Sequence, residues 1–111
     1  MTDATSRVLA EDELARQLED LPGVTVADDG QLVVTFRAPT FPEAVRLVQL
    51  VAEDAEQLDH HPDIDIRWRT VRFALTTHSA GGITQRDIEL AHVILRTAAD
   101  LGARTVEPQG S

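Results

Sequence analysis

The stretch HHPDIDIRWRTVRFAL, residues 60–75, decides the fold, because two strand patterns of opposite parity meet within it. Ile64, Ile66 and Trp68 alternate with charged residues, which is typical of a strand with one buried face. From Val71 onward the apolar positions carry odd numbers instead. Because a shift of one residue turns every side chain to the opposite face, the pattern predicts a tight turn just before Val71. We therefore predict two strands here, paired as an antiparallel hairpin.

A second hairpin and three helices are predicted around this one. The second hairpin joins strands at 24–27 and 32–37 across an Asp-Gly turn. Apolar residues recur at helical spacing over residues 9–21, 41–58 and 84–99, and proline or glycine follows each segment. The order of helix, two strands, helix, two strands and helix indicates an α+β fold, αββαββα. In it a four-stranded antiparallel sheet has the helices packed on one face.

Length and hydropathy indicate a single globular domain. We expect the 111 residues to form one domain, 1–111, with a folded core at about 9–100 and mobile termini. The first twenty residues contain no apolar run, so no signal peptide is expected. No apolar stretch reaches the roughly 20 residues that span a bilayer. A cytoplasmic location is the resulting expectation.

The charge balance argues against a nucleic-acid partner. The formal net charge of −9 repels phosphates and anionic membrane surfaces. Arg67, Arg69 and Arg72 form a local basic cluster that could meet an anionic group. We interpret them instead as solvated strand residues paired with carboxylates. Direct contact with nucleic acid or membrane is therefore not expected.

Missing residue types exclude several classes of chemistry. The sequence contains no cysteine, no tyrosine and no lysine. Disulfides, thiolate nucleophiles, cysteine zinc sites and lysine Schiff bases are therefore impossible. The G-x-S-x-G motif of serine hydrolases is also missing. Imidazoles and carboxylates remain as the groups able to carry chemistry.

Three histidines are candidate proton-transfer groups. His60 and His61 follow the apolar stripe of the second predicted helix, and His78 comes between the last predicted strand and a glycine-rich loop. If the two hairpins share one sheet, these imidazoles would face one concavity. Histidine is the only side chain whose unperturbed pKa lies between pH 5 and 8, so such a cluster suits proton transfer. His92 lies mid-helix and is interpreted as an ordinary surface or interface residue.

Two carboxylates near the histidines are further candidates. Glu56 and Asp59 lie at a helix C-terminus, where negative charge is unfavourable, and positions that break a local rule are often functional. Simpler interpretations stay open: a loop histidine pair is often surface decoration, Asp87 suits a helix cap and Trp68 suits the core. A metal site also stays open, although adjacent histidines rarely bind one ion and the usual i, i+2 or i, i+4 spacings are missing.

The spacing of these residues resembles the signature of the pterin-4a-carbinolamine dehydratases, also called 4a-hydroxytetrahydrobiopterin dehydratases. The segments AEQLDHHPDI and TTHSAGGITQRDIELA look like family sequence, and the resemblance covers about residues 9–100. It implies the αββαββα fold of that family. The agreeing positions are Glu56, His60, His61, Pro62, Trp68, His78 and Asp87.

The resemblance implies a dehydration without metal or organic cofactor. The family removes water from 4a-hydroxytetrahydrobiopterin and releases quinonoid dihydropterin, a step of tetrahydrobiopterin recycling. The pterin is thus the implied small-molecule partner. The resemblance assigns general acid–base catalysis to His60, His61 and His78. Supporting or substrate-binding roles fall on Glu56, Asp59, Trp68, Thr77, Arg86 and Asp87.

Roles within this implied site are expected to differ. His60 and His78 form the expected acid–base pair, with the third histidine binding or assisting. Asp59 and Asp87 are expected to orient the imidazoles, and Arg86 to act as a charge partner of Asp87. These assignments come from the resemblance and not from the spacing alone.

One departure from the family pattern and two other functions remain to be weighed. Val24 stands where the family usually has an aromatic residue, so stacking on the pterin would be weaker. One alternative is a non-catalytic pterin-binding or protein-interaction member, since animal members also serve as dimerisation partners of a transcription factor. The other is a dehydratase for a different pterin, such as one in molybdopterin metabolism.

The wide apolar surface of the helix at 41–58 and the open sheet edges favour a homodimer or homotetramer.

Overall fold

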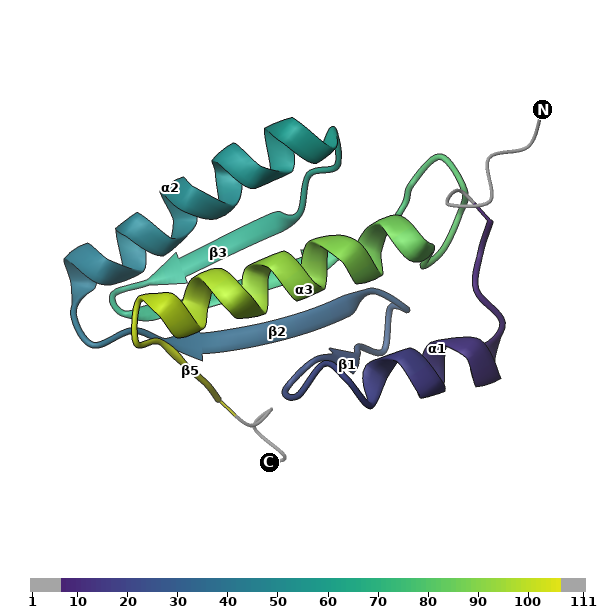
Figure 1. Ribbon diagram of the computed structural model, residues 1–111, viewed down its shortest axis with the longest axis horizontal. Coiled ribbons are helices and arrows are strands. Elements are labelled where there is room, and N and C mark those ends of the chain that lie inside the picture. The colour runs from purple at the N-terminus through teal and green to yellow at the C-terminus, as the bar shows by residue number, and fades with distance from the viewer. Residues whose placement is uncertain (1–6, 107–111) are drawn as a thin grey trace.

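The computed structural model describes residues 7–106 and confirms the predicted α+β fold (Figure 1). Two hairpins form one antiparallel sheet, and α2 and α3 lie side by side across one face of it. No helix in this part of the chain is long and apolar enough to cross a lipid bilayer. The elements are α1 Glu11–Leu18, β1 Thr25–Val26, β2 Leu32–Arg37, α2 Phe41–Leu58, β3 Asp63–Arg67, β4 Thr70–Leu75, α3 Gln85–Asp100 and β5 Arg104–Thr105.

The two hairpins meet through their inner strands, β2 and β4, which pair antiparallel along their whole length. β3 pairs with the other edge of β4 and forms one border of the sheet. β1 and β5 share the other edge of β2, because β1 pairs with residues 32–33 and β5 with residues 36–37. Ile64 of β3 lies opposite Phe73 of β4, so the parity change in the sequence corresponds to the β3–β4 turn.

The core lies between the sheet and the helices. Phe36 and Phe73 are fully buried on adjacent inner strands, with ring centroids 6.0 Å apart in an edge-on arrangement. Burial of a large apolar side chain contributes about 1.5–3 kcal/mol, so this layer fixes how α2 and α3 sit on the sheet. The buried residues of α2 are Ala44, Leu47, Val51 and Ala55, and the buried apolar residues of α3 are Ile88, Leu90, Ala91, Ile94 and Ala98.

Trp68 corrects one expectation, because it is not a core residue. It lies in the turn between β3 and β4 with a left-handed φ of 54°, and its side chain is 85 % exposed. The strand ends one residue earlier, at Arg67. The alternation that begins at Ile64 therefore stops before it reaches Trp68.

The two ends of the described chain contain strand pairing that was not predicted from the sequence. Val8 forms a β-bridge with Thr84, and β5 adds a fifth strand to the predicted four. The first helix is shorter than predicted and covers Glu11–Leu18. The mobility expected for residues 1–6 and 107–111 concerns positions outside the described residues.

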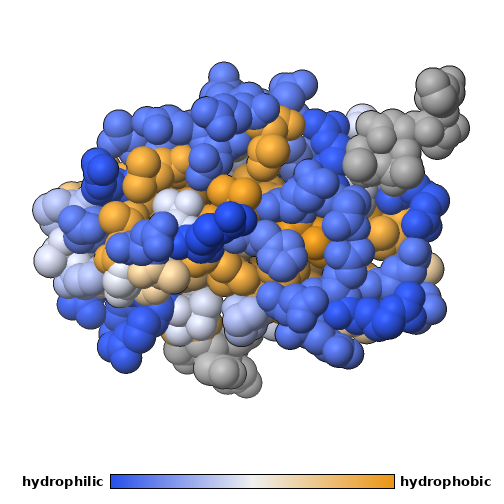
Figure 2. Space-filling view, viewed as in Figure 1, coloured by the Kyte–Doolittle hydropathy of each residue, from blue (hydrophilic) through white to orange (hydrophobic). Residues whose placement is uncertain are grey.

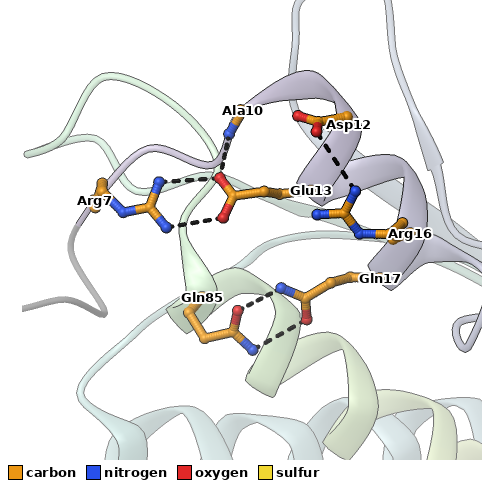
Figure 3. A network of polar contacts seen from close by, with 7 residues as sticks. All are labelled: Arg7, Ala10, Asp12, Glu13, Arg16, Gln17 and Gln85. Atoms are coloured by element: carbon orange, nitrogen blue, oxygen red, sulfur yellow. Dashed lines mark hydrogen bonds and ion pairs between the residues drawn. The ribbon is translucent and has the colours of Figure 1, made fainter.

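Arg7 ties the start of the described chain to α1 (Figure 3). Its guanidinium donates to both carboxylate oxygens of Glu13 at 3.0 Å, and Glu13 also accepts from the N–H of Ala10 at 3.0 Å. These bonds, chiefly the one to the Arg7 side chain, lower the pKa of Glu13 to about 2. Acidic groups also suit this first turn of α1, where the helix dipole is positive.

We expect the Glu13 carboxyl to titrate near pH 2 in the folded protein. Because this pKa lies below the ordinary value of 4.5, the stabilisation by Glu13 is complete above about pH 4.5 and is lost as the pH falls toward 2. The measurement is the ¹³C shift of the Glu13 carboxyl against pH. Arg7→Ala should move the midpoint toward 4.5, whereas Arg16→Ala, which breaks the neighbouring pair with Asp12, should leave it near 2. A wild-type midpoint near 4.5 would contradict the prediction.

Candidate functional site

The end of α2 places His60 in a defined position. α2 closes with Asp59 in the left-handed conformation, at φ 51° and ψ 45°. The N–H of Asp59 donates to the carbonyl of Glu56 at 3.2 Å, and the N–H of His60 donates to that of Ala55 at 3.0 Å. These two bonds form a Schellman motif, which turns the chain sharply out of the helix. A left-handed non-glycine residue costs roughly 1–2 kcal/mol, so this turn marks a constrained position beside the histidines.

A buried carboxylate holds the ring of His60. Oδ1 of Asp87 lies 2.6 Å from Nε2 of His60, and the two residues are 0 % and 8 % exposed. Oδ2 of Asp87 accepts from the Thr77 hydroxyl at 2.8 Å and from the Thr84 N–H at 2.9 Å. Since an ionised carboxylate only accepts, Nε2 of His60 carries the proton that it donates to Asp87. In this tautomer Nδ1 of His60 carries no proton.

Thr77 and Thr84 connect the end of β4 to the start of α3. Thr84 caps α3, because its hydroxyl oxygen accepts from the N–H of Arg86 at 3.2 Å. The two threonine hydroxyl oxygens are 2.8 Å apart. Since the hydroxyl hydrogen of Thr77 goes to Asp87, Thr84 is the donor between them. The helix cap predicted at this position therefore also orients the carboxylate behind His60.

The three candidate histidines line one cavity of about 270 Å³. His60 is buried, whereas His61 and His78 are exposed. The cavity lies between the end of α2 and the loop after β4, so its histidines come from two separate segments of the chain. Sequence reasoning missed Thr76 and Ser79, whose only signal was their closeness to His78. The full lining is Asp59, His60, His61, Thr76, Thr77, His78, Ser79 and Arg86.

His61 is held less firmly than His60. Its Nε2 is hydrogen-bonded to Oε2 of Glu56, and the two side chains are 57 % and 75 % exposed. An ion pair in such an exposed position contributes about 0–1 kcal/mol. The structure therefore gives the two adjacent histidines different environments, one buried and one exposed.

The expected pairing of Arg86 with Asp87 is wrong. Nη2 of Arg86 donates instead to the carbonyl of Asp59 at 2.6 Å and reaches that of Leu58 at 3.4 Å. These carbonyls end α2, where the helix dipole is negative and a cation is favourable. Arg86 thus fastens the start of α3 to the end of α2 and supports the left-handed residue before His60.

Neither Trp68 nor Val24 lines this cavity. Trp68 lies at the opposite end of β3 from His60 and His61, where it borders a separate apolar hollow that includes Phe41. Its expected support of the histidine site is therefore not found within one chain. Val24 is buried in the hydrophobic core and is 6 % exposed. The aromatic wall expected at that position would thus face the core of this chain and not the cavity.

Two of the carboxylates near the histidines are each hydrogen-bonded to one imidazole. Asp87 bonds to His60, and Glu56 bonds to His61. Among residues 7–106, no three histidine, aspartate or glutamate side chains converge in a group that could hold a metal ion.

The fold and the cavity together define a class of protein: a small α+β domain with an imidazole site built on a buried carboxylate. The pterin 4 alpha carbinolamine dehydratase family model matches residues 7–97. A Nocardia farcinica protein, named by inference as a pterin-4-alpha-carbinolamine dehydratase, is 53 % identical over 90 residues. That match covers 81 % of this chain and 94 % of the relative. A Mycolicibacterium smegmatis protein with the same name is 50 % identical over 93 residues, 84 % of this chain and 98 % of the relative.

A solved structure agrees with these sequence matches. The crystal structure of a transcriptional coactivator/pterin dehydratase from Brucella melitensis superposes with a TM-score of 0.80 at 31 % identity. The superposition covers 83 % of this chain and 99 % of that one. The chain therefore belongs to the pterin-4-alpha-carbinolamine dehydratase family.

Proposed function

We propose that this protein removes water from 4a-hydroxytetrahydrobiopterin by histidine general acid–base catalysis. Family membership supports the reaction class. The observation that carries the mechanism is the His60–Asp87 pair, in which a buried carboxylate engages one ring nitrogen and leaves the other available. His61 and His78 line the same cavity, which supplies a second proton-transfer group within reach of one substrate.

The reaction breaks one C–O bond and forms one C=N bond. The hydroxyl on C4a gains a proton from an acid and leaves as water with the C–O electron pair. N5 loses its proton to a base, and its electron pair forms the C4a=N5 double bond of the quinonoid dihydropterin. Each such proton transfer by a positioned side chain contributes typically about 10²–10⁴-fold. A reductase can return this product to the tetrahydro form, which places the step in tetrahydrobiopterin recycling.

The histidines take different parts in this proposal. His60 accepts the N5 proton at Nδ1, and Asp87 stabilises the imidazolium that forms. His78, from the loop after β4, gives a proton to the 4a-oxygen. His61 assists in binding. Because His60 and His78 come from different segments, their roles exchange when the opposite stereoisomer of the carbinolamine is bound.

The proposed function is tested by turnover of freshly generated 4a-hydroxytetrahydropterin, followed by absorbance. The wild type should accelerate dehydration over the spontaneous reaction. His92→Ala should do the same, because His92 is exposed on α3 and does not line the cavity. A folded wild type that binds a pterin without accelerating the reaction would contradict the assignment. The same assay on other reduced pterins then identifies the preferred substrate.

We also propose that the protein assembles with copies of itself, as a homodimer or homotetramer, through α2 and β3. Phe41 and Val45 of α2 are 54 % and 46 % exposed. Figure 2 shows apolar side chains at the surface along α2 and in the strip between α2 and α3. Exposed apolar surface of this kind is typical of an interaction site.

The edge strand β3 suits a second copy as the partner. Antiparallel pairing of two β3 strands centred on Asp65 would place Asp63 opposite Arg67 of the other copy. The same register would place Ile64 opposite Ile66. The Asp63–Arg67 and Ile64–Ile66 pairs are therefore self-complementary, whereas the two Asp65 carboxylates would face each other unfavourably at the centre. The pairing would also cover an open sheet edge.

Val45→Glu is expected to lower the solution mass to that of a monomer. Burying an unpaired carboxylate against the apolar surface of another subunit is unfavourable by several kcal/mol. Ala99→Glu is the matched control, since Ala99 is exposed on α3 and introduces the same charge. The measurement is sedimentation velocity with circular dichroism to verify the fold. A Val45→Glu protein with the wild-type mass, or a wild type that is already monomeric, would contradict assembly through α2.

A further inference from the structure

We propose that residues 7–10, here called the N-terminal strap, are a positioning element of the histidine site. The strap holds the end of the loop after β4 and the start of α3, and through Thr84 it keeps Asp87 in place behind His60. Its effect on turnover rests on the proposed function. Its effect on the loop and on the His60 ring does not.

The strap lies directly against three consecutive residues of the loop. Val8 forms an antiparallel bridge with Thr84, and the N–H of Leu9 donates to the carbonyl of Ile83 at 2.9 Å. A Cβ atom built on Gly82 would be 3.1 Å from Cγ1 of Val8. Because Gly82 has no side chain, there is room for the side chain of Val8 at this position. The strap adds both backbone bonds and a side-chain contact to this loop.

Thr84 connects the strap to the site. Its N–H donates to Oδ2 of Asp87 at 2.9 Å, and its hydroxyl lies 2.8 Å from that of Thr77. Thr84 and Asp87 are both 0 % exposed, so water has no access to replace a bond that is lost. A displacement of Thr84 therefore changes the carboxylate that orients the His60 ring.

The strap is fastened to α1 at its start, and α1 is fastened to α3 (Figure 3). Nη1 and Nη2 of Arg7 each donate one hydrogen bond to the Glu13 carboxylate. Gln17 and Gln85 exchange two amide hydrogen bonds, at 2.7 and 3.2 Å, and Gln85 directly follows the Thr84 cap. The side chains of Arg7 and Glu13 are 56 % and 31 % exposed. Removal of Arg7 should therefore release the strap while the core stays folded.

The test compares Arg7→Ala with Arg16→Ala in the full chain. Arg16 lies on α1, the helix that carries Glu13, and pairs with Asp12 at 3.5 Å, away from the strap. Hydrogen exchange of the Thr84 amide is measured against that of the Phe73 amide in the core strand β4. The ¹⁵N shifts of the His60 ring report its tautomer, and pterin turnover gives kcat and KM separately.

Arg7→Ala should raise Thr84 exchange by about tenfold relative to Phe73, as local opening does. It should also shift the His60 ring signals toward a mixture of tautomers. In turnover, kcat should fall by roughly 3- to 10-fold because the ring is misplaced, with KM changed less. Arg7→Lys, which keeps a cation but not the fork, should lie between Arg7→Ala and the wild type. Arg16→Ala should match the wild type in every measurement.

Two results would overturn the strap proposal. One is an Arg7→Ala protein that matches Arg16→Ala in Thr84 exchange and in the His60 ring signals. The other is an equal rise in exchange at Thr84 and Phe73, which would indicate general destabilisation. If the wild type shows no dehydration, the proposed function fails, and the exchange and ring signals still decide the role of the strap.

Discussion

Replacing His60 by glutamine is expected to lower kcat for carbinolamine dehydration by about 10²–10⁴-fold, the range of a lost acid–base group. The glutamine amide can still donate to Asp87, so the buried carboxylate keeps a partner on Oδ1. It cannot take up and return a proton near neutral pH. The fall in kcat should therefore occur without loss of the fold, which separates proton transfer from structural support.

Two further variants control this result. His92→Gln makes the same chemical change at an exposed position on α3 and should keep the wild-type kcat. His60→Ala should lose activity as well and should also lower the free energy of unfolding by about 1–3 kcal/mol, because Asp87 loses a donor. Thermal unfolding of each variant is measured beside turnover. Near wild-type turnover by His60→Gln would remove His60 from the mechanism.

Asp87→Asn is expected to lower kcat by a similar factor, roughly 10²–10⁴-fold, by changing the tautomer of His60. The Thr77 hydroxyl and the Thr84 N–H both donate to one oxygen of Asp87, so the asparagine carbonyl must face them. Its NH₂ group then faces Nε2 of His60 as a donor. Nε2 must become the acceptor, and the ring proton moves to Nδ1. The nitrogen proposed to take the N5 proton is then already protonated.

The signature of this effect is spectroscopic. The ¹⁵N shifts of the His60 ring should show the protonated nitrogen changing from Nε2 in the wild type to Nδ1 in Asp87→Asn. Glu56→Gln makes the same change beside His61, where the pair is exposed, and should lower kcat by less than about tenfold. Unchanged ring shifts and unchanged kcat in Asp87→Asn would show that Asp87 is no more than a helix cap.

Much of the fold follows from local patterns. Proline and glycine positions, strand alternation and helical spacing predicted both hairpins and all three helices, with errors mainly at their ends. The short strand β5 was missed because two residues carry no periodic signal, and they become a strand only by pairing with β2. Trp68 was misjudged because it continues the alternation of Ile64 and Ile66 in the sequence. In the structure the chain already turns at Trp68.

The candidate site likewise combines features that the local sequence predicted with features that depend on packing. Residue types and spacing were enough to single out His60, His61 and His78, because the missing cysteine, lysine and tyrosine leave few other groups for chemistry. Which partner each residue takes depends on atoms far apart in the sequence. Arg86 lies next to Asp87 in the chain, yet its side chain reaches the carbonyl of Asp59 on another helix.

Local sequence was therefore sufficient for the elements, their order and the chemical groups available in this protein. Burial, partners and orientation came from packing: the buried Asp87, its hydrogen bond to His60 and the Val8–Thr84 bridge depend on contacts between separate segments. The physical reason is the distance along the chain over which each effect acts. Backbone propensity and periodicity act over a few residues, whereas a hydrogen bond between residues 27 positions apart exists only after the sheet and the helices have packed.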